Sequence, residues 1–140
     1  MRILLFGHTY QPSRSEQIRH VLQTLSRTEA ELVAHGDFYD FLSKEFPDVC
    51  HRIEEIDCRG DYTADMALSI GGDGTFLRAA EKIGDRGIPV LGVNIGRLGF
   101  LADVPAEEVE PVLNEILEGK YKIEERSLLQ VEFNGLSENF

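Results

Sequence analysis

Residues 69–76 read Ser-Ile-Gly-Gly-Asp-Gly-Thr-Phe and place one carboxylate among three glycines. Because glycine has no Cβ, the backbone at Gly71, Gly72 and Gly74 can bend sharply and lie close to a ligand. The stretch follows an apolar run and precedes a helical pattern, which directs free backbone N–H groups toward an anion such as phosphate. The negative charge of Asp73 would repel a phosphate. We therefore expect Asp73 to accept a proton or to organise a metal ion.

A second glycine-containing stretch follows the next apolar run, and residues 94–101 read Asn-Ile-Gly-Arg-Leu-Gly-Phe-Leu. Gly96 and Gly99 again allow the backbone to approach a ligand closely. The same stretch offers three apolar side chains as a surface for a flat ring: Leu98, Phe100 and Leu101. If both stretches follow neighbouring parallel strands, they meet at the carboxyl edge of the sheet, where such sheets bind ligands.

Alternating strand and helix patterns lead to the two stretches and connect them. Continuous apolar runs at residues 64–70 and 88–93 are typical of parallel strands that are covered on both faces. The apolar stripe of a helix is predicted between them: Phe76, Leu77, Ala80 and Ile83. Two further strands are expected at residues 2–6 and 31–35, with a helix between them whose N-cap is Ser15. This alternation predicts an α/β fold with an open, mainly parallel sheet and helices on both faces.

The pattern changes after residue 104. A helix is predicted first, then one or two strands within residues 121–133, and Asn134-Gly135 is a strong hairpin signal. We therefore expect residues 1–104 to form an α/β domain that carries the Gly-Gly-Asp-Gly loop. Residues 105–140 would contribute a connecting helix and the first strands of an incomplete β-rich domain.

Composition narrows the classes of function. The net charge of −11 provides no basic surface for nucleic acid. The chain contains no apolar run of about 18 residues, so we expect no membrane span. The short apolar N-terminal stretch is followed by His8 and Gln11 too soon for a signal peptide, so we expect a cytoplasmic protein. Cys50 and Cys58 match neither a disulfide framework nor a zinc pattern. Residues 47–65 show no assignable element, and no role is assigned to the scattered histidines, which include His8 and His35.

The motifs together resemble those of NAD kinases over essentially the whole chain. The resemblance is carried by residues 71–75 (Gly-Gly-Asp-Gly-Thr), by residues 94–101, and more weakly by Ile-Glu-Glu-Arg-Ser-Leu-Leu at residues 123–129. The Gly-Gly-Asp-Gly element alone also resembles that of lipid kinases and phosphofructokinases. The second motif is what separates NAD kinases from lipid kinases. The resemblance implies a Rossmann-like, phosphofructokinase-like N-terminal domain.

The family's reaction is phosphoryl transfer from ATP, or from polyphosphate, to the 2′-hydroxyl of the adenosine ribose of NAD. The resemblance implies that Asp73 accepts the proton of that hydroxyl and that Mg²⁺ is held mainly through the nucleotide phosphates, with no metal ligands from the protein. It implies nucleotide contacts for a set of residues in both motifs: Gly71, Gly72, Gly74, Thr75, Phe76, Arg78, Asn94, Gly96, Leu98, Gly99, Phe100 and Leu101. It also implies a homo-oligomer, dimer or tetramer, in the complete protein.

Family members are about twice as long, and their second domain carries an Asn-acid pair and a small-residue stretch that this chain lacks. We therefore expect little or no kinase activity from these 140 residues alone. Two alternatives remain open. One is a lipid kinase of the diacylglycerol type, and the other is a nucleotide-binding regulatory module without catalysis. Binding of NAD, ATP or a diacylglycerol would separate the three.

Overall fold

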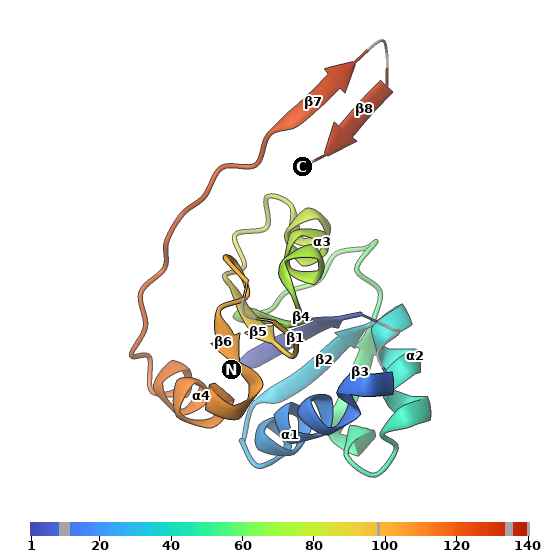
Figure 1. Cartoon of the computed structure of the whole chain (residues 1–140), viewed down its shortest axis with the longest axis vertical. Helices are drawn as coiled ribbons and strands as arrows, with labels where there is room; N and C mark the ends of the chain where they lie inside the picture. The colour runs from blue at the N-terminus through green and yellow to red at the C-terminus, as the bar shows by residue number, and fades with distance from the viewer. Residues whose placement is uncertain (9–11, 98, 134–135, 140) are drawn as a thin grey trace.

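The computed structural model describes residues 1–8, 12–97, 99–133 and 136–139 (Figure 1). Its strands are β1 (Arg2–Gly7), β2 (Glu31–His35), β3 (Ile53–Ile56), β4 (Met66–Gly71), β5 (Val90–Asn94), β6 (Val104–Pro105), β7 (Gln130–Phe133) and β8 (Leu136–Asn139). Its α-helices are α1 (Ser15–Ser26), α2 (Gly36–Glu45), α3 (Asp73–Ile83) and α4 (Val109–Leu117). Three short 3₁₀ turns accompany them: η1 (Pro12–Arg14), η2 (Cys50–Arg52) and η3 (Ala106–Glu108).

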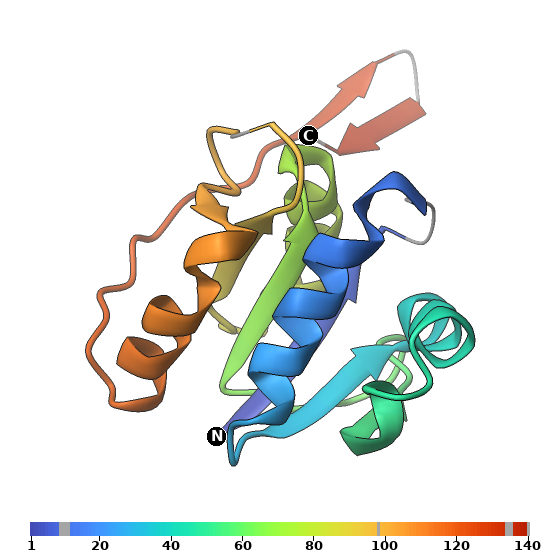
Figure 2. The ribbon, with the colours of Figure 1, turned by 60° about the horizontal axis from the view of Figure 1, so that its bottom comes forward.

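Six strands form one sheet in the order β3-β2-β1-β4-β5-β6, and every pair in it is parallel. The helices cover both faces: Figure 2 shows α1 and α4 in front of the sheet and α3 behind it. Apolar side chains of alternate strand residues pack into two separate cores, one on each face. The strand β4 is buried over its whole length, which explains its continuous apolar run. The predicted fold class is confirmed.

The direction in which successive strands are added to the sheet reverses between β1 and β4. From β1 the chain passes through α1 to β2 on one side, and from β4 it passes through α3 to β5 on the other. Strands β1 and β4 are neighbours, with Gly7 opposite Ile70. The carboxyl ends of these two strands therefore flank the switch point at which open α/β sheets bind ligands.

Two local predictions need correction, and one stretch without a predicted element proves to contain a strand. The helix α1 begins at Ser15, so the N-cap is Arg14 and not Ser15. The helix α3 buries Thr75, Ala79 and Ile83, whereas Leu77 is 43% exposed, because the row of residues four apart that starts at Thr75 lies against the sheet. Residues 47–65 contain the strand β3 and the turn η2, for which the sequence offered no assignment.

Beyond α4, residues 120–129 contain no helix or strand and lead away from the sheet (Figure 1). Strands β7 and β8 then pair antiparallel, with Phe133 opposite Leu136. The predicted turn at 134–135 lies outside the described residues. Within the described parts of the chain, no helix is both long and apolar enough to cross a membrane.

Candidate functional site

The two glycine-containing stretches meet at the carboxyl edge of the sheet. Gly71 ends β4 and lies opposite Asn94, the last residue of β5. The link continues past the strands, because the backbone N–H of Ile95 donates to the carbonyl of Gly71 at 3.1 Å. The expected proximity of the two motifs is therefore confirmed, and the first motif leaves the sheet at β4, which flanks the switch point.

The glycines of the first stretch have different structural roles. A Cβ at Gly71 would overlap the hydroxyl of Thr75, so this glycine allows α3 to turn tightly onto the end of β4. A Cβ at Gly72 would meet nothing within 4 Å, and one at Gly74 would meet only the Arg78 guanidinium, at 3.6 Å. The first N–H groups of an α-helix have no intrahelical acceptor. The open backbone at Gly72 and Gly74 therefore leaves the start of α3 accessible to an anion.

The Asp73 carboxylate faces the second stretch and contacts its backbone directly. Its Oδ1 accepts N–H bonds from Leu101 at 2.9 Å and Ala102 at 3.1 Å, and its Oδ2 accepts one from Phe100 at 3.0 Å. These three donors, Ala102 first, hold the pKa of Asp73 below its ordinary value. A ribose cannot lie between the carboxylate and these amides, so it would have to approach Asp73 from the open side.

The side chain of Asn94 holds the second stretch in shape through hydrogen bonds to its backbone. The residue is only 4% exposed. Its Nδ2 donates to the carbonyls of Arg97 and Ala102, and its Oδ1 accepts the N–H of Gly96 at 2.7 Å. These bonds use both N–H groups of the amide and one of the two lone pairs of Oδ1, so Asn94 stabilises the shape of the loop. The nucleotide contact that the resemblance implied for Asn94 stays a prediction.

Of the other residues predicted for the site, some pack beneath the second stretch and others are exposed on its surface. A Cβ at Gly92, in β5, would lie 2.6 Å from Cα of Ala102 and 3.0 Å from the Phe76 ring, so Phe76 packs beneath this loop. Phe100 is 98% exposed and presents a free aromatic ring, while Leu101 is half-buried. Gly96 is exposed. Leu98 lies outside the described residues.

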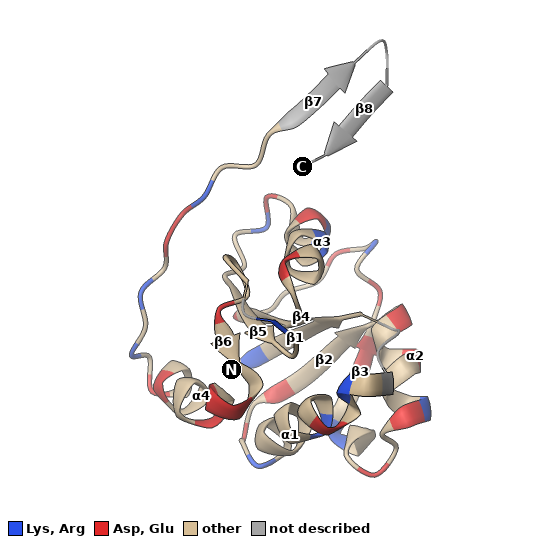
Figure 3. Ribbon diagram, in the orientation of Figure 1, with Lys and Arg blue, Asp and Glu red and all other residues tan. Residues whose placement is uncertain are grey.

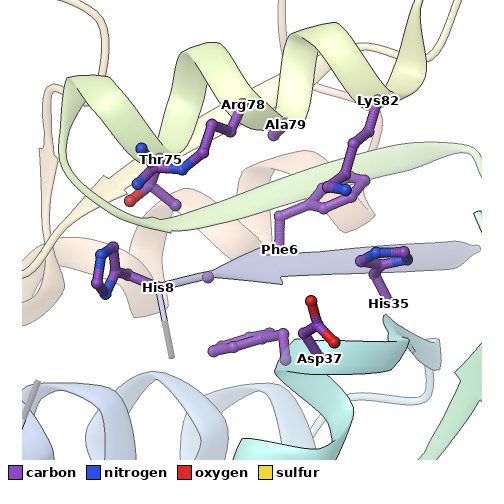
Figure 4. A pocket seen from close by; sticks show the side chains of 10 residues that line it. Phe6, His8, His35, Asp37, Thr75, Arg78, Ala79 and Lys82 are labelled. Carbon is purple, nitrogen blue, oxygen red and sulfur yellow. The ribbon is translucent and has the colours of Figure 1, made fainter. Parts of the chain in front are cut away.

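A cavity of about 280 Å³ opens on the other side of α3 (Figure 4). It is lined from three segments that are distant in the sequence: Phe6, Gly7 and His8; His35, Asp37 and Phe38; Thr75, Arg78, Ala79 and Lys82. Two of these residues, Thr75 and Arg78, belong to the predicted site. The residue pattern indicated no role for His8, His35 or Lys82. The one available signal was that His8 follows β1 and that His35 ends β2, at the same edge of the sheet as Gly71.

The cavity lining favours an anion. Arg78 and Lys82 contribute two positive charges, and Asp37 contributes one negative charge. The ring of His35 lies 6.3 Å from that of Phe6, and its Nδ1 is buried with no hydrogen-bond partner among the described residues. Burial, together with the charge of Lys82, lowers the pKa of His35. Acidic residues gather on α4 and on α2, which contributes Asp37 to the lining (Figure 3). The excess of positive charge in the cavity therefore contrasts with the net charge of −11 of the whole chain.

The described residues do not form a protein-held metal centre. No three His, Cys, Asp or Glu side chains among residues 1–8, 12–97, 99–133 and 136–139 are grouped to bind a metal ion. The carboxylate nearest to the glycine turn, Asp73, already accepts three N–H groups.

Comparison with known proteins shows which family the sequence matches. Residues 3–121 match the family model of the ATP-NAD kinase N-terminal domain. An NAD kinase of Bacteroides fragilis is 41% identical over 131 residues, which are 94% of this chain and 45% of that protein. An NAD kinase of Porphyromonas gingivalis is 38% identical over 143 residues, which cover 99% of this chain and 48% of that protein. The chain thus spans about half the length of these relatives.

The fold also has a counterpart among solved structures. The crystal structure of yeast NADH kinase complexed with NADH superposes with a TM-score of 0.71 at 21% identity. The match covers 86% of this chain and 36% of the yeast chain. It supports the arrangement of the α/β sheet described above.

Proposed function

The chain belongs to the ATP-NAD kinase family through that family's N-terminal domain, and on this premise we propose that the complete protein phosphorylates the 2′-hydroxyl of the adenosine ribose of NAD. One observation carries the proposal: the Asp73 carboxylate lies where the two glycine-containing loops meet. In this reaction the hydroxyl oxygen bonds to the γ-phosphorus of ATP and the bond from that phosphorus to ADP breaks. The hydroxyl proton passes to a nearby base, which we assign to Asp73.

The loop after β5 is the proposed side for the acceptor. The exposed ring of Phe100 offers a flat apolar surface beside Asp73, which suits the adenine of NAD. Asn94 keeps this loop in shape from inside. The adenosine ribose would then lie on the open side of the carboxylate, with its 2′-hydroxyl within reach of a proton acceptor.

The cavity on the other side of α3 is the proposed side for the donor. Arg78 lines it near the start of α3, where unpaired N–H groups and the helix dipole favour phosphate. Lys82 and the imidazole of His35 extend this lining away from the glycine turn, whereas His8 lies at the same end as Thr75 (Figure 4). A triphosphate that runs from the cavity toward Gly72 would bring its γ-phosphorus to the edge where Asp73 lies.

Mg²⁺ belongs to this proposal as part of the donor. It would enter bound to the phosphates and neutralise charge that develops on them during transfer. The protein's own contribution is to hold the phosphates and to orient the hydroxyl. The wider expectations belong to the same proposal: a division near residue 104, cytoplasmic location, and a homo-oligomer of the complete protein.

The test separates the donor and acceptor sides in the full-length protein, with NAD, ATP and Mg²⁺ supplied. Arg78→Met should raise the KM for ATP about tenfold and leave the KM for NAD unchanged, since one charged contact to phosphate is lost. Phe100→Ala should raise the KM for NAD and leave that for ATP unchanged. Lys44→Met, an exposed change at the end of α2, is the matched control and should alter neither.

Three results would contradict the proposal. The full-length protein could form no NADP, it could phosphorylate a diacylglycerol in place of NAD, or it could bind both nucleotides without turnover. The last two results would favour the lipid kinase and the regulatory module, respectively.

A further inference from the structure

The two oxygens of Asp73 do not share their three hydrogen bonds equally. Oδ1 accepts from both Leu101 and Ala102, whereas Oδ2 accepts only from Phe100. A carboxylate offers about four lone-pair sites, two on each oxygen. Oδ1 is therefore fully used by the protein, and the one remaining acceptor site of Asp73 belongs to Oδ2.

The close contact between Asp73 and the loop depends on Gly99. A Cβ at this position would overlap Oδ1 and lie 2.7 Å from Cγ of Asp73. The next residue is Phe100, whose N–H is one of the three donors and whose ring is 98% exposed. The backbone that Asp73 holds is thus the same backbone that presents this ring to solvent.

We propose that Asp73 is a positioning residue as well as the proton acceptor, and that its two oxygens divide these tasks. Oδ1 fixes the backbone at Leu101 and Ala102, which keeps the adjoining Phe100 in place to meet the nucleotide. Oδ2 accepts the N–H of Phe100 and keeps its remaining lone pair for the substrate hydroxyl. The inference rests on the proposed function for the identity of that nucleotide. When the hydroxyl oxygen bonds to phosphorus and the bond to ADP breaks, the proton moves to Oδ2, and Oδ1 continues to hold the loop.

Amide hydrogen exchange of the full-length protein tests the positioning role without any ligand. Asp73→Asn keeps an oxygen that can accept from Leu101 and Ala102 but turns its NH₂ toward the N–H of Phe100. We expect this variant to retain protection at Leu101 and Ala102 and to lose it at Phe100. Asp73→Ala should lose protection at all three amides. Unchanged exchange of the three amides in Asp73→Ala would overturn the proposal.

Nucleotide binding and turnover of the full-length protein supply the second readout. Both Asp73 variants should lose turnover, because neither has a proton acceptor at the position of Oδ2. Asp73→Ala should also bind NAD about tenfold more weakly, whereas Asp73→Asn should stay within about threefold of the unaltered protein. Equal NAD affinity in the two variants, both close to that of the unaltered protein, would reduce Asp73 to a proton acceptor alone and overturn the proposal.

Gly99→Ala supplies an independent variant with the carboxylate intact. Its Cβ displaces Asp73 from the loop, so we expect NAD binding to weaken as it does in Asp73→Ala. Asp85→Asn removes an exposed carboxylate beyond the far end of α3 and is the matched control, with exchange, affinity and turnover unchanged. If the unaltered full-length protein forms no NADP, the proposed function fails, and the exchange measurement still decides whether Asp73 positions the loop.

Discussion

His35 shows how a single residue links the cavity to the stability of the fold. In the folded protein, burial and the charge of Lys82 lower its pKa below the ordinary value of 6.5, and Asp37 and Asp57 oppose this shift. Below pH 6.5 the unfolded chain therefore binds more protons at this residue than the folded protein does. The stability that His35 contributes is fully present above that pH and is lost as the pH falls toward the folded pKa.

We predict that His35→Asn will lose less stability than the unaltered chain between about pH 7.5 and about pH 5.5. Urea unfolding at the two pH values measures the difference. His51→Asn, a change at an exposed histidine, is the control and should behave like the unaltered chain. An equal loss of unfolding free energy in His35→Asn and in the unaltered chain would mean that protonation of His35 does not destabilise the fold, and would contradict the prediction.

At the same scale, the glycines show what residue types could and could not predict. Their presence predicted close backbone approach, and the structure places such an approach at Gly71 and Gly99. At both positions, however, the group that approaches is another part of the protein, Thr75 or Asp73. Gly72 instead faces open space, and a Cβ at Gly74 would make only ordinary contact with the Arg78 guanidinium. Composition and spacing could not separate these two uses, because the difference depends on which side chain folds back onto each glycine.

At the scale of elements, burial on both faces decided which strands could be predicted. The strands β4 and β5 are central and carry continuous apolar runs. The strand β3 pairs on one side only, and its Glu54 and Glu55 are exposed, so neither an apolar run nor an alternating pattern marks it. Charged residues on an edge strand discourage pairing with other chains. The exposed glutamates that obscured β3 in the sequence are thus the residues that protect an edge strand from pairing with other chains.

A neighbouring contact holds these elements together and can be tested. Arg52, in the turn before β3, donates to the carbonyls of Ser26, Thr28 and Ala30 between α1 and β2. Arg52→Met would leave these acceptors without their donor. We predict a loss of about 2 kcal/mol in unfolding free energy, measured by urea denaturation. Arg27→Met, at an exposed arginine of the same connection, should lose far less. Equal losses of unfolding free energy in Arg52→Met and Arg27→Met would show that the three hydrogen bonds of Arg52 do not stabilise the fold.

At the scale of the whole molecule, topology creates the cavity. Its lining comes from the ends of β1 and β2, from the start of α2 and from α3, and the parallel order of the sheet brings these segments to one edge. The segments outside α3 carry no recognisable motif, so the sequence could indicate the edge but not the cavity. The Asp73 contact was predictable in part, because both loops follow neighbouring strands. The direct bonds to three backbone N–H groups depend on the loop shape that Asn94 sets from within.

The rate of NADP formation by full-length Asp73→Asn, at saturating NAD, ATP and Mg²⁺, tests the central claim most directly. We predict that kcat falls by about 10²–10⁴-fold, the range typical for loss of a general base, while NAD remains bound. Turnover equal to that of the unaltered protein would contradict the account, because the carboxylate between the two loops would then take no part in the transfer.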